Sequence, residues 1–496
     1  MFKLLFKKKT GLFKLRCLFS AVILLFVLIF LFLKIVPGGH ITYTKNYTNY
    51  LRSGKGFIYN FTPTERIDEK SKRSPQLVGN PVYFSVFTPR TFSKAKITVK
   101  YKSGLSSSTP IIEAGVLADN IVWRYALKPL QNKILDDLIL NNKNLQAGGL
   151  TLWQAENNYR DLSKFLIDLK NNNLQDCISE ANSCLAVYNY NPDFNFQLKE
   201  LKDSLPIKIS TPLRGAHTLS FYVNNEPLHL DIEFIDLNLD KVADPLVIIL
   251  SRDGKVIKEE VLLDDNLRPT SGQEEQKDLS LKADNLPPGL YKVEIKITDD
   301  TVIKSIQSSL DRFVFNSKLW PVSSNKNLSI FTDSNYLQVK AFAPASVQNI
   351  IFGGHSFSLS TPYKQFDFQL EGGAIVKEIK LSKDDVILET DGIFSFNRNL
   401  VFNPALSKVN RFFSKPEEKK YILFDYDLPL AENDKTIASA EFDLIGVYRE
   451  KGKYNFMISV PGLKEDDAVD DYLEIIEIKI EFSGRTLWQK IFGLGK

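Results

Sequence analysis

Residues 472–482 read Tyr-Leu-Glu-Ile-Ile-Glu-Ile-Lys-Ile-Glu-Phe, and apolar and charged side chains alternate along most of this stretch. A period of two places successive side chains on opposite faces of a β-strand. A similar alternation runs through residues 95–101, and short strand-like runs recur along the chain. The chain contains 35 Phe and 19 Tyr against 2 Met, and aromatic residues favour strands. The sequence therefore predicts a mainly β protein with serial β-sandwich or jelly-roll domains.

Length and local patterns divide the chain into several parts. At 496 residues the chain is too long for one ordinary domain. Apolar residues recur every three or four positions over 127–139 and 159–169, which predicts two amphipathic helices beside the first strands. The predicted order is a stalk at 37–79, a β-sandwich with this small helical insertion at 80–205, an immunoglobulin-like sandwich at 206–317, and a sandwich or jelly roll at 318–496, alternatively two domains divided near 405.

Two regions resemble the β-domains of bacterial cell-surface proteins. Asp253-Gly254 joins two apolar runs, as a hairpin turn does, and a Pro-Pro-Gly turn at 287–289 precedes a strand that starts at Tyr291. This order resembles the late corner of bacterial immunoglobulin-like domains, in which a tyrosine pins the turn. Residues 420–483 resemble the closing strands of galactose-binding-like jelly rolls. Both resemblances imply a β-sandwich fold, and neither implies a particular function.

The N-terminus has the clearest local pattern. Six basic residues precede residue 17, and residues 17–33 contain no charged side chain. With Ile35 and Val36 the apolar stretch is long enough to cross a hydrocarbon core of ~30 Å as a helix. The basic residues predict a cytoplasmic segment at 1–16, one membrane span at 17–36 and an extracytoplasmic remainder. The alternative is a cleaved signal peptide, whose apolar core is usually shorter and ends in small residues.

The charge balance argues against a nucleic-acid-binding protein. The chain has 63 Lys and Arg and 59 Asp and Glu, and seven of the basic residues lie in 1–36. The remaining chain therefore has 56 basic and 59 acidic residues, a net charge of −3. Such a chain offers no strongly basic surface for phosphates.

Catalytic motifs are sparse in this sequence. The chain has 4 His, and none belongs to a His-Glu-x-x-His zinc pair; a Gly-x-Ser-x-Gly nucleophile motif is absent too. Adjacent carboxylates such as Asp264 and Asp265 leave open the alternative that the chain is an exported glycan-active enzyme. Such pairs are, however, usually solvated turn residues. The sequence therefore favours a non-catalytic protein.

Residues 236–244 read Asp-Leu-Asn-Leu-Asp-Lys-Val-Ala-Asp, and this run of oxygen-bearing side chains predicts a calcium loop. Ca²⁺ takes about 6–8 oxygen ligands, which a loop can supply from alternate positions. The run resembles the calcium loops of dockerin-type extracellular repeats, although Lys241 replaces the turn glycine and Val247 stands at position 12. A solvated turn is the alternative. The candidate ligands, at positions 1, 3, 5 and 9, are Asp236, Asn238, Asp240 and Asp244.

The two cysteines beyond the predicted membrane span are candidates for a disulfide. Cys177 and Cys184 are separated by a turn-like segment, and an extracytoplasmic location permits oxidation. The third cysteine, Cys17, lies at the cytoplasmic edge of the predicted span and is expected to remain a free thiol.

These patterns together predict a membrane-anchored extracytoplasmic surface protein whose β-domains serve binding, adhesion or scaffolding. Its expected partners are the lipid bilayer, through residues 17–36, and other surface proteins or glycans. The alternative function is carbohydrate binding, because jelly rolls often bind glycans through exposed aromatic rings. Trp123, Tyr125 and Trp153 are the candidates for that role, and core packing is the alternative for each.

Overall fold

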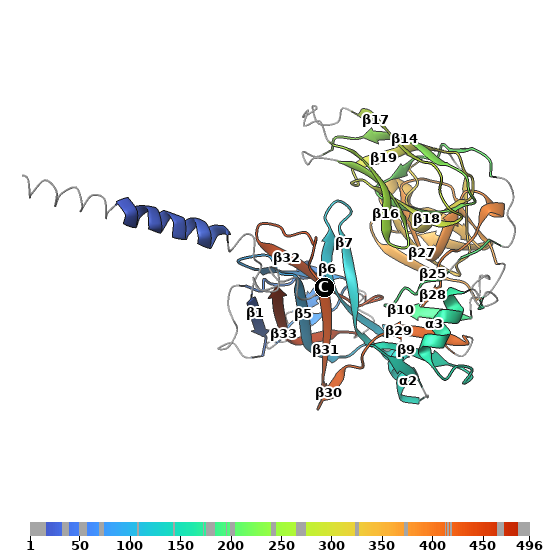
Figure 1. Cartoon of the computed structure of the whole chain (residues 1–496). Helices are drawn as coiled ribbons and strands as arrows, with labels where there is room; N and C mark the ends of the chain where they lie inside the picture. The colour runs from blue at the N-terminus through green and yellow to red at the C-terminus, as the bar shows by residue number, and fades with distance from the viewer. Residues whose placement is uncertain are drawn as a thin grey trace, which may run out of the picture. The chain divides into compact units, whose positions relative to one another are not determined.

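The structure of this chain is a computed structural model, and it is mainly β, as the sequence predicts (Figure 1). The chain divides into two compact units. Unit 1 comprises Met1–Leu140 and Asp427–Lys496, and unit 2 comprises Asn141–Tyr426. The residues described are 16–31, 39–48, 57–68, 74–106, 109–141, 144–171, 173–174, 184–194, 196–198, 204–239, 245–263, 274–322, 327–371, 375–411, 413, 416, 419–463 and 471–484.

The predicted membrane span lies partly outside the described residues. Residues 16–31 are helical and exposed, whereas 1–15 and 32–36 lie outside the description. Within the described ranges, no helix combines the length and the apolar character that crossing a bilayer requires.

Unit 1 consists of two sheets that enclose one apolar core. Buried side chains of the larger sheet, such as Ile97 and Val99, pack with Val82 and Phe84 of the smaller sheet in this core. The larger sheet contains β1 (Gly39–Asn46), β2 (Ile67–Asp68), β3 (Gln76–Leu77), β5 (Lys94–Ser103), β30 (Leu430–Glu432), β31 (Lys435–Asp443) and β33 (Leu473–Gly484). The smaller sheet has the order β4 (Val82–Phe87), β32 (Lys453–Ser459), β6 (Ile111–Asp119) and β7 (Arg124–Asn132).

The opening sequence stretch forms β33, and its one irregularity has a structural counterpart. The register between β33 and β5 shifts between Ile475 and Glu477, so Ile476 is an extra residue in the ladder. A bulge of this kind restores the alternation after two consecutive apolar residues. As a result, Ile475 and Ile478 both face the core.

Strands far apart in the sequence share the sheets of unit 1. The sequence analysis placed residues 80–205 and 318–496 in separate domains, whereas β31 and β33 pair with β5, and β32 pairs with β4 and β6. The predicted stalk at 37–79 contributes β1, which pairs with β33 from Gly39↔Gly484 to Asn46↔Glu477. The segment reads as a linker because only alternate residues of this edge strand, such as Ile41 and Tyr43, contact the core.

The helical insertion is shorter than the sequence predicts. Residues 124–132 form β7, and helix α2 (Lys133–Asn141) covers only the second half of the first predicted helix. Pro129 lies in β7, where an edge strand tolerates its missing N–H and a helix would not. The second helix, α3 (Leu162–Lys170), forms as predicted, and Asp161 caps it by accepting from the Ser163 N–H at 3.0 Å.

In unit 2, α3 covers a small sheet and lies beside it in Figure 1. Leu162, Phe165 and Leu169 pack with buried residues of the strands, including Leu152 and Leu423. The strands are β8 (Leu145–Ala147), β9 (Leu150–Gln154), β10 (Leu185–Tyr188), β28 (Ser407–Lys408) and β29 (Tyr421–Asp425).

The rest of unit 2 is a double β-sandwich. Its five-stranded sheet contains β11 (Ile207–Ile209), β12 (Leu213–Arg214), β14 (Leu228–Asp236), β17 (Glu275–Ala283) and β19 (Thr301–Ser308). Its twelve-stranded sheet contains β13 (His217–Val223), β15 (Leu246–Arg252), β16 (Lys255–Leu262), β18 (Gly289–Lys296), β20 (Phe313–Leu319), β21 (Leu328–Thr332), β22 (Tyr336–Ala341), β23 (Gln348–Phe352), β24 (His355–Leu359), β25 (Gln365–Gln369), β26 (Lys377–Leu381) and β27 (Val386–Ser395). Short 3₁₀ turns occur in unit 1 at η1 (Thr64–Arg66) and in unit 2 at η2 (Pro344–Ser346) and η3 (Arg398–Leu400).

The local turns of the double sandwich are as the sequence predicts. β15 and β16 form the hairpin, with φ of 50° at Asp253 and 73° at Gly254, which is the region that glycine and aspartate tolerate best. The hydroxyl of buried Tyr291 donates to the Pro287 carbonyl at 2.8 Å and so pins the turn before its strand.

A joint of buried side chains connects the two halves of the double sandwich. β20 pairs with β13 on one side and β27 on the other, so one sheet runs through both halves. Trp320 follows β20 and is fully buried, with its indole N–H donating to Asp385 at 2.9 Å. The Trp320 backbone N–H donates to Nε2 of His217, and Nδ1 of that histidine lies 2.8 Å from the Gly215 carbonyl.

We expect His217 to make the protein less stable in mild acid. Burial lowers the pKa of His217 to about 3. The nearby charge of Lys318 also lowers this pKa, whereas the hydrogen bond to Gly215 raises it. The unfolded chain takes up a proton near pH 6.5 and the folded chain does not, so stability falls as pH drops below that value. From pH 7 to pH 5 the loss is about 2 kcal/mol.

Urea unfolding of His217→Gln at both pH values checks this expectation. The variant should lose most of the pH dependence, although its stability at pH 7 should also fall. His355→Gln is the matched control, because His355 is exposed on β24 and its replacement should leave the pH dependence unchanged. Equal pH dependence in His217→Gln and in the unsubstituted protein would contradict the assignment.

Candidate binding face and polar clasps

The smaller sheet of unit 1 has an apolar stripe on the side that faces away from the core. We call this side, with Tyr83, Gly115, Trp123, Tyr125, Leu127, Asn455 and Met457, the outer face. Trp123 is 62% exposed and Leu127 is 41% exposed, while Tyr125 between them is half-buried. Alternate residues of a strand share one face, so Tyr125 and Leu127 form a row along β7, and Trp123 lies in the turn just before this strand.

Two tyrosines from opposite edges of the sheet meet across the outer face. The ring centroids of Tyr83 on β4 and Tyr125 on β7 are 5.4 Å apart, with planes inclined by 42°. Two strands lie between β4 and β7, so their backbones are separated by ~14 Å at the usual strand spacing. Both side chains must therefore lean inward over the middle strands.

Glycine in the middle of the sheet permits this arrangement. Tyr83 is opposite Met457 in the ladder, and Met457 is opposite Gly115. A Cβ atom at Gly115 would lie 2.7 Å from the Met457 Cγ and 2.9 Å from a Leu127 methyl carbon. These distances are too short for non-bonded carbons, so only glycine lets Met457 and Leu127 approach beneath the two rings.

Polar groups border the aromatic pair. The Ser85 hydroxyl donates to Asn455 Oδ1 at 2.7 Å, which leaves the Asn455 amide N–H groups directed elsewhere. Burial raises the pKa of Tyr125 to about 12, with a further contribution from Tyr83, so its hydroxyl is a proton donor at neutral pH. Among the residues that the structure describes, neither tyrosine hydroxyl has a hydrogen-bond partner.

The structure brings together two of the three predicted glycan-binding residues. Trp123 and Tyr125 belong to the outer face. Trp153 lies in β9 of unit 2 and is 6% exposed. Every residue of β9 is buried, so both faces of this strand are covered. The sequence analysis missed Tyr83, Leu127 and Met457. The alternation in β4 would have placed Tyr83 on the exposed side, but nothing local links it to Tyr125.

The predicted calcium ligands are only partly described. Asp236 is buried and lies 2.9 Å from the ammonium group of Lys277, and the Asn238 N–H donates to its other oxygen at 3.0 Å. Asp240 and Asp244 lie outside the described residues. Within the described part of the chain, no group of three or more His, Cys, Asp or Glu is arranged to hold a metal ion. The calcium loop remains a prediction.

The predicted disulfide also falls partly outside the description. Cys184 is disulfide-bonded. Its predicted partner, Cys177, lies outside the described residues, and the pairing stays a prediction. Cys17 is a free, exposed cysteine.

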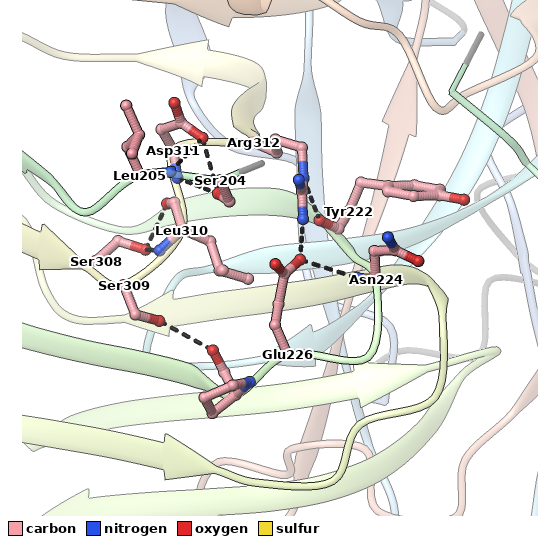
Figure 2. A network of polar contacts seen from close by, with 11 residues as sticks. Ser204, Leu205, Tyr222, Asn224, Glu226, Ser308, Ser309, Leu310, Asp311 and Arg312 are labelled. Carbon is pink, nitrogen blue, oxygen red and sulfur yellow. Dashed lines mark hydrogen bonds and ion pairs between the residues drawn. The ribbon is translucent and has the colours of Figure 1, made fainter. Parts of the chain in front are cut away.

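A polar clasp holds the segment that leads into the double sandwich (Figure 2). Asp311 accepts from the Ser204 hydroxyl at 2.8 Å and from the Leu205 N–H at 3.3 Å. Next to it, buried Arg312 forms an ion pair with Glu226, and Figure 2 shows this carboxylate between Arg312 and Asn224. These contacts fix the incoming segment to the end of β19 and the start of β20.

A second clasp holds the segment that leaves the double sandwich. The amide of Asn403 donates to Asp333 at 2.6 Å, and the amide of Asn410 donates to Asp391 at 3.1 Å. Arg411 lies 2.7 Å from Asp367, and the side chains of this pair are each 12% exposed. Asp367 also accepts from Tyr336 at 2.9 Å and from Gln338 at 3.0 Å.

The second clasp combines one ion pair with two hydrogen bonds from amides to carboxylates. Burial alone would raise the pKa of Asp367, but hydrogen bonds from Gln338, Arg411 and Tyr336 together lower it, so the carboxylate is ionised and paired. Each of the three aspartates has a named partner on the outgoing segment. The arrangement therefore fastens the outgoing segment to the double sandwich. Burial raises the pKa of Asp333, and the nearby charge of Asp391 acts in the same direction.

Comparisons with known proteins add little to this geometry. No family model and no curated protein matches the sequence. Solved structures similar to the chain include dimeric latent PorU from Porphyromonas gingivalis (10% identity, TM-score 0.16), with 62% of this chain aligned. The chain spans only 32% of the length of PorU.

Two further structures are similar to the chain at the same low level. One is a triple jelly-roll protein of an archaeal virus (7% identity, TM-score 0.16), which covers 75% of this chain and 98% of its own length. The other is the tandem CBM22 domain of Xyn10C from Paenibacillus barcinonensis (10% identity, TM-score 0.15), with 58% of this chain and 88% of that chain covered. Similarities at this level identify no family, and the functional argument rests on the side chains.

Proposed function

We propose that this chain is a membrane-anchored extracytoplasmic surface protein whose β-domains bind and hold a partner without catalysis. The observation that carries the proposal is the row of half-buried Tyr125 and exposed Leu127 on β7, with exposed Trp123 in the turn before it. Soluble β-proteins usually cover such rows, and a contiguous apolar patch on a sheet face is typical of a binding surface. The outer face is therefore the proposed binding surface.

The anchor in this proposal is the segment at 17–36. Residues 16–31 are helical, and several of their large apolar side chains, such as Phe19 and Phe26, are more than half exposed. A bilayer would cover this apolar surface, and the basic residues before it favour a cytoplasmic N-terminus. The first strand of unit 1 is β1 at Gly39, so the proposed anchor shortly precedes this strand in the sequence.

The pairing of buried charges in unit 2 supports the non-catalytic part of this proposal. The ion pairs and hydrogen bonds of Arg312, Asp333, Asp367 and Asp391 all join segments of unit 2 to one another. Charges used in this way stabilise the fold of unit 2.

Membrane fractionation of the full chain tests the proposal. We expect the protein to stay with membranes through an alkaline wash, and protease added outside the cell to degrade both units. A variant in which Leu24, Phe26 and Leu28 are replaced by Asp should be released into the soluble fraction. Release of the unsubstituted protein by the wash, or full protection from the external protease, would contradict the proposed location.

A further inference from the structure

We propose that the outer face binds a neutral sugar chain, which stacks on Tyr125, Trp123 and Tyr83. The inference rests on the proposed function, because it names the partner of the same face. Pyranose rings have an apolar face of C–H groups and a rim of hydroxyls, so they require both an aromatic platform and nearby polar groups. The outer face combines these two features.

The aromatic platform is extended along one strand. Tyr125 and Leu127 are alternate residues of β7, so their Cα atoms are ~7 Å apart, and Trp123 adds a third large side chain in the turn that leads into the strand. Tyr83 widens the platform at Tyr125, where the two rings are in contact. A platform longer than one ring suits a chain of sugars better than a single monosaccharide.

Trp123 adds an independent observation. Its φ is 47°, a conformation that bulky residues rarely adopt and that costs free energy. It lies at the end of the β6–β7 hairpin, where Asp119 accepts from the Ile121 N–H at 2.9 Å. The turn therefore keeps the Trp123 ring exposed to solvent just before β7. Folding alone would favour burying such a large apolar ring.

The polar groups match the rim of a sugar. The hydroxyls of Tyr83 and Tyr125 lack partners among the described residues, and Asn455 uses its carbonyl oxygen for Ser85. Two hydroxyls and an amide N–H are thereby available as donors or acceptors beside the rings. A flat protein partner would need about 800 Å² of surface, which a single row of three side chains does not provide.

The charges around the face favour a neutral ligand. Lys453 lies with its ammonium group 3.8 Å from the centroid of the Tyr59 ring, and Arg124 lies 3.9 Å from Asp119. A third cation, Arg66, is close enough to act on Tyr83, and it donates to the Pro81 carbonyl at 2.7 Å. Each of the three cations already has a partner, so an acidic sugar would gain little from them. This distinguishes the site from a surface built for sulfated or carboxylated glycans, which needs cations directed at the ligand.

Binding of soluble glycans to the full chain in detergent tests the inference. The probes are xylan, mixed-linkage β-glucan and galactomannan as neutral chains, with alginate as the acidic comparison, each measured by affinity electrophoresis. We expect retardation by at least one neutral glycan and none by alginate. Tyr125→Ala should weaken that binding about tenfold or more, which corresponds to ~1.4 kcal/mol. Tyr125→Phe should retain part of it, because the ring remains.

Tyr363→Ala is the matched control, because Tyr363 is 59% exposed and belongs to unit 2. It should bind like the unsubstituted protein, and thermal unfolding of each variant shows whether the fold is intact. Binding to alginate alone, no binding to any neutral glycan, or equal binding by Tyr125→Ala and the unsubstituted protein would overturn the inference. A chain that stays in the membrane and fails these tests would leave the proposed function standing with a protein as partner.

Discussion

Replacing Arg411 by Ala is expected to destabilise unit 2 by about 3–5 kcal/mol. Arg411 and Asp367 are both largely buried, and the substitution would leave the Asp367 carboxylate without its cation. Hydrogen bonds from Tyr336 and Gln338 would remain, but neither carries a compensating charge. Removing one partner of a buried ion pair costs more than the pair itself contributes, because the remaining charge has lost its water.

Hydrogen exchange of β22 and β25 is the measurement for Arg411→Ala, because a chain with two units does not unfold in one step. Lys96→Ala is the matched control. Lys96 pairs with Glu441 at 3.8 Å on an exposed face, and such pairs contribute at most about 1 kcal/mol. If both substitutions have the same small effect, the second clasp does not hold unit 2 together.

Acid should remove the same stabilisation in the unsubstituted protein. The pKa of Asp367 is lower in the folded chain than in the unfolded chain, so the stabilisation is complete above about pH 4 and is lost as pH falls further. The double variant Arg411→Ala with Asp367→Asn should be more stable than Arg411→Ala alone, because it no longer buries an unpaired charge.

Trp320→Ala is expected to cost about 3–5 kcal/mol, as is usual for the loss of a buried tryptophan. The Trp320 ring lies 4.6 Å from the Phe342 ring, and the guanidinium group of Arg214 is 5.2 Å from its centroid. The substitution would create a cavity at the joint of the double sandwich and leave Asp385 without the indole N–H.

Two milder variants separate these contributions. Trp320→Phe keeps much of the apolar volume and loses the hydrogen bond, so it should cost clearly less than Trp320→Ala. Asp385→Asn keeps an acceptor for the indole N–H and should have the smallest effect. Thermal unfolding of all three variants, with the exposed-site variant Tyr363→Ala for comparison, gives the order. If Trp320→Ala unfolds at the same temperature as Tyr363→Ala, close packing around Trp320 does not stabilise the joint.

Features that depend on neighbouring residues could be predicted from the sequence. Alternation identified β5 and β33, and the Asp253-Gly254 pair identified the β15–β16 hairpin. Each of these has its cause within a few residues, either in the side-chain period or in the conformations that a turn requires. The tyrosine that pins a turn, Tyr291, was identified for the same reason.

Features that depend on distant segments could not be predicted. β4 pairs with β32, yet about 370 residues separate Ser85 from Asn455. Alternation shows that each segment has an apolar face and does not show which segment covers it. The outer face has the same difficulty, because its residues come from β4, β6, β7 and β32. In the sequence, Trp153 and Trp123 looked equally suited to binding a glycan. The structure distinguishes them, because β9, which contains Trp153, is buried on both faces.

The pairing of β1 with β33 determines when each unit can fold. Unit 1 needs strands from both ends of the described chain, and β1 has no neighbour in its sheet until residues 477–484 have been synthesised. Unit 2 lies wholly between residues 141 and 426, so all of its strands are available earlier. Folding during synthesis would therefore finish the inner unit first. Until the last strand arrives, β1 remains unpaired and β5 has only β31 as a neighbour, so a chain released early would expose strand edges to aggregation.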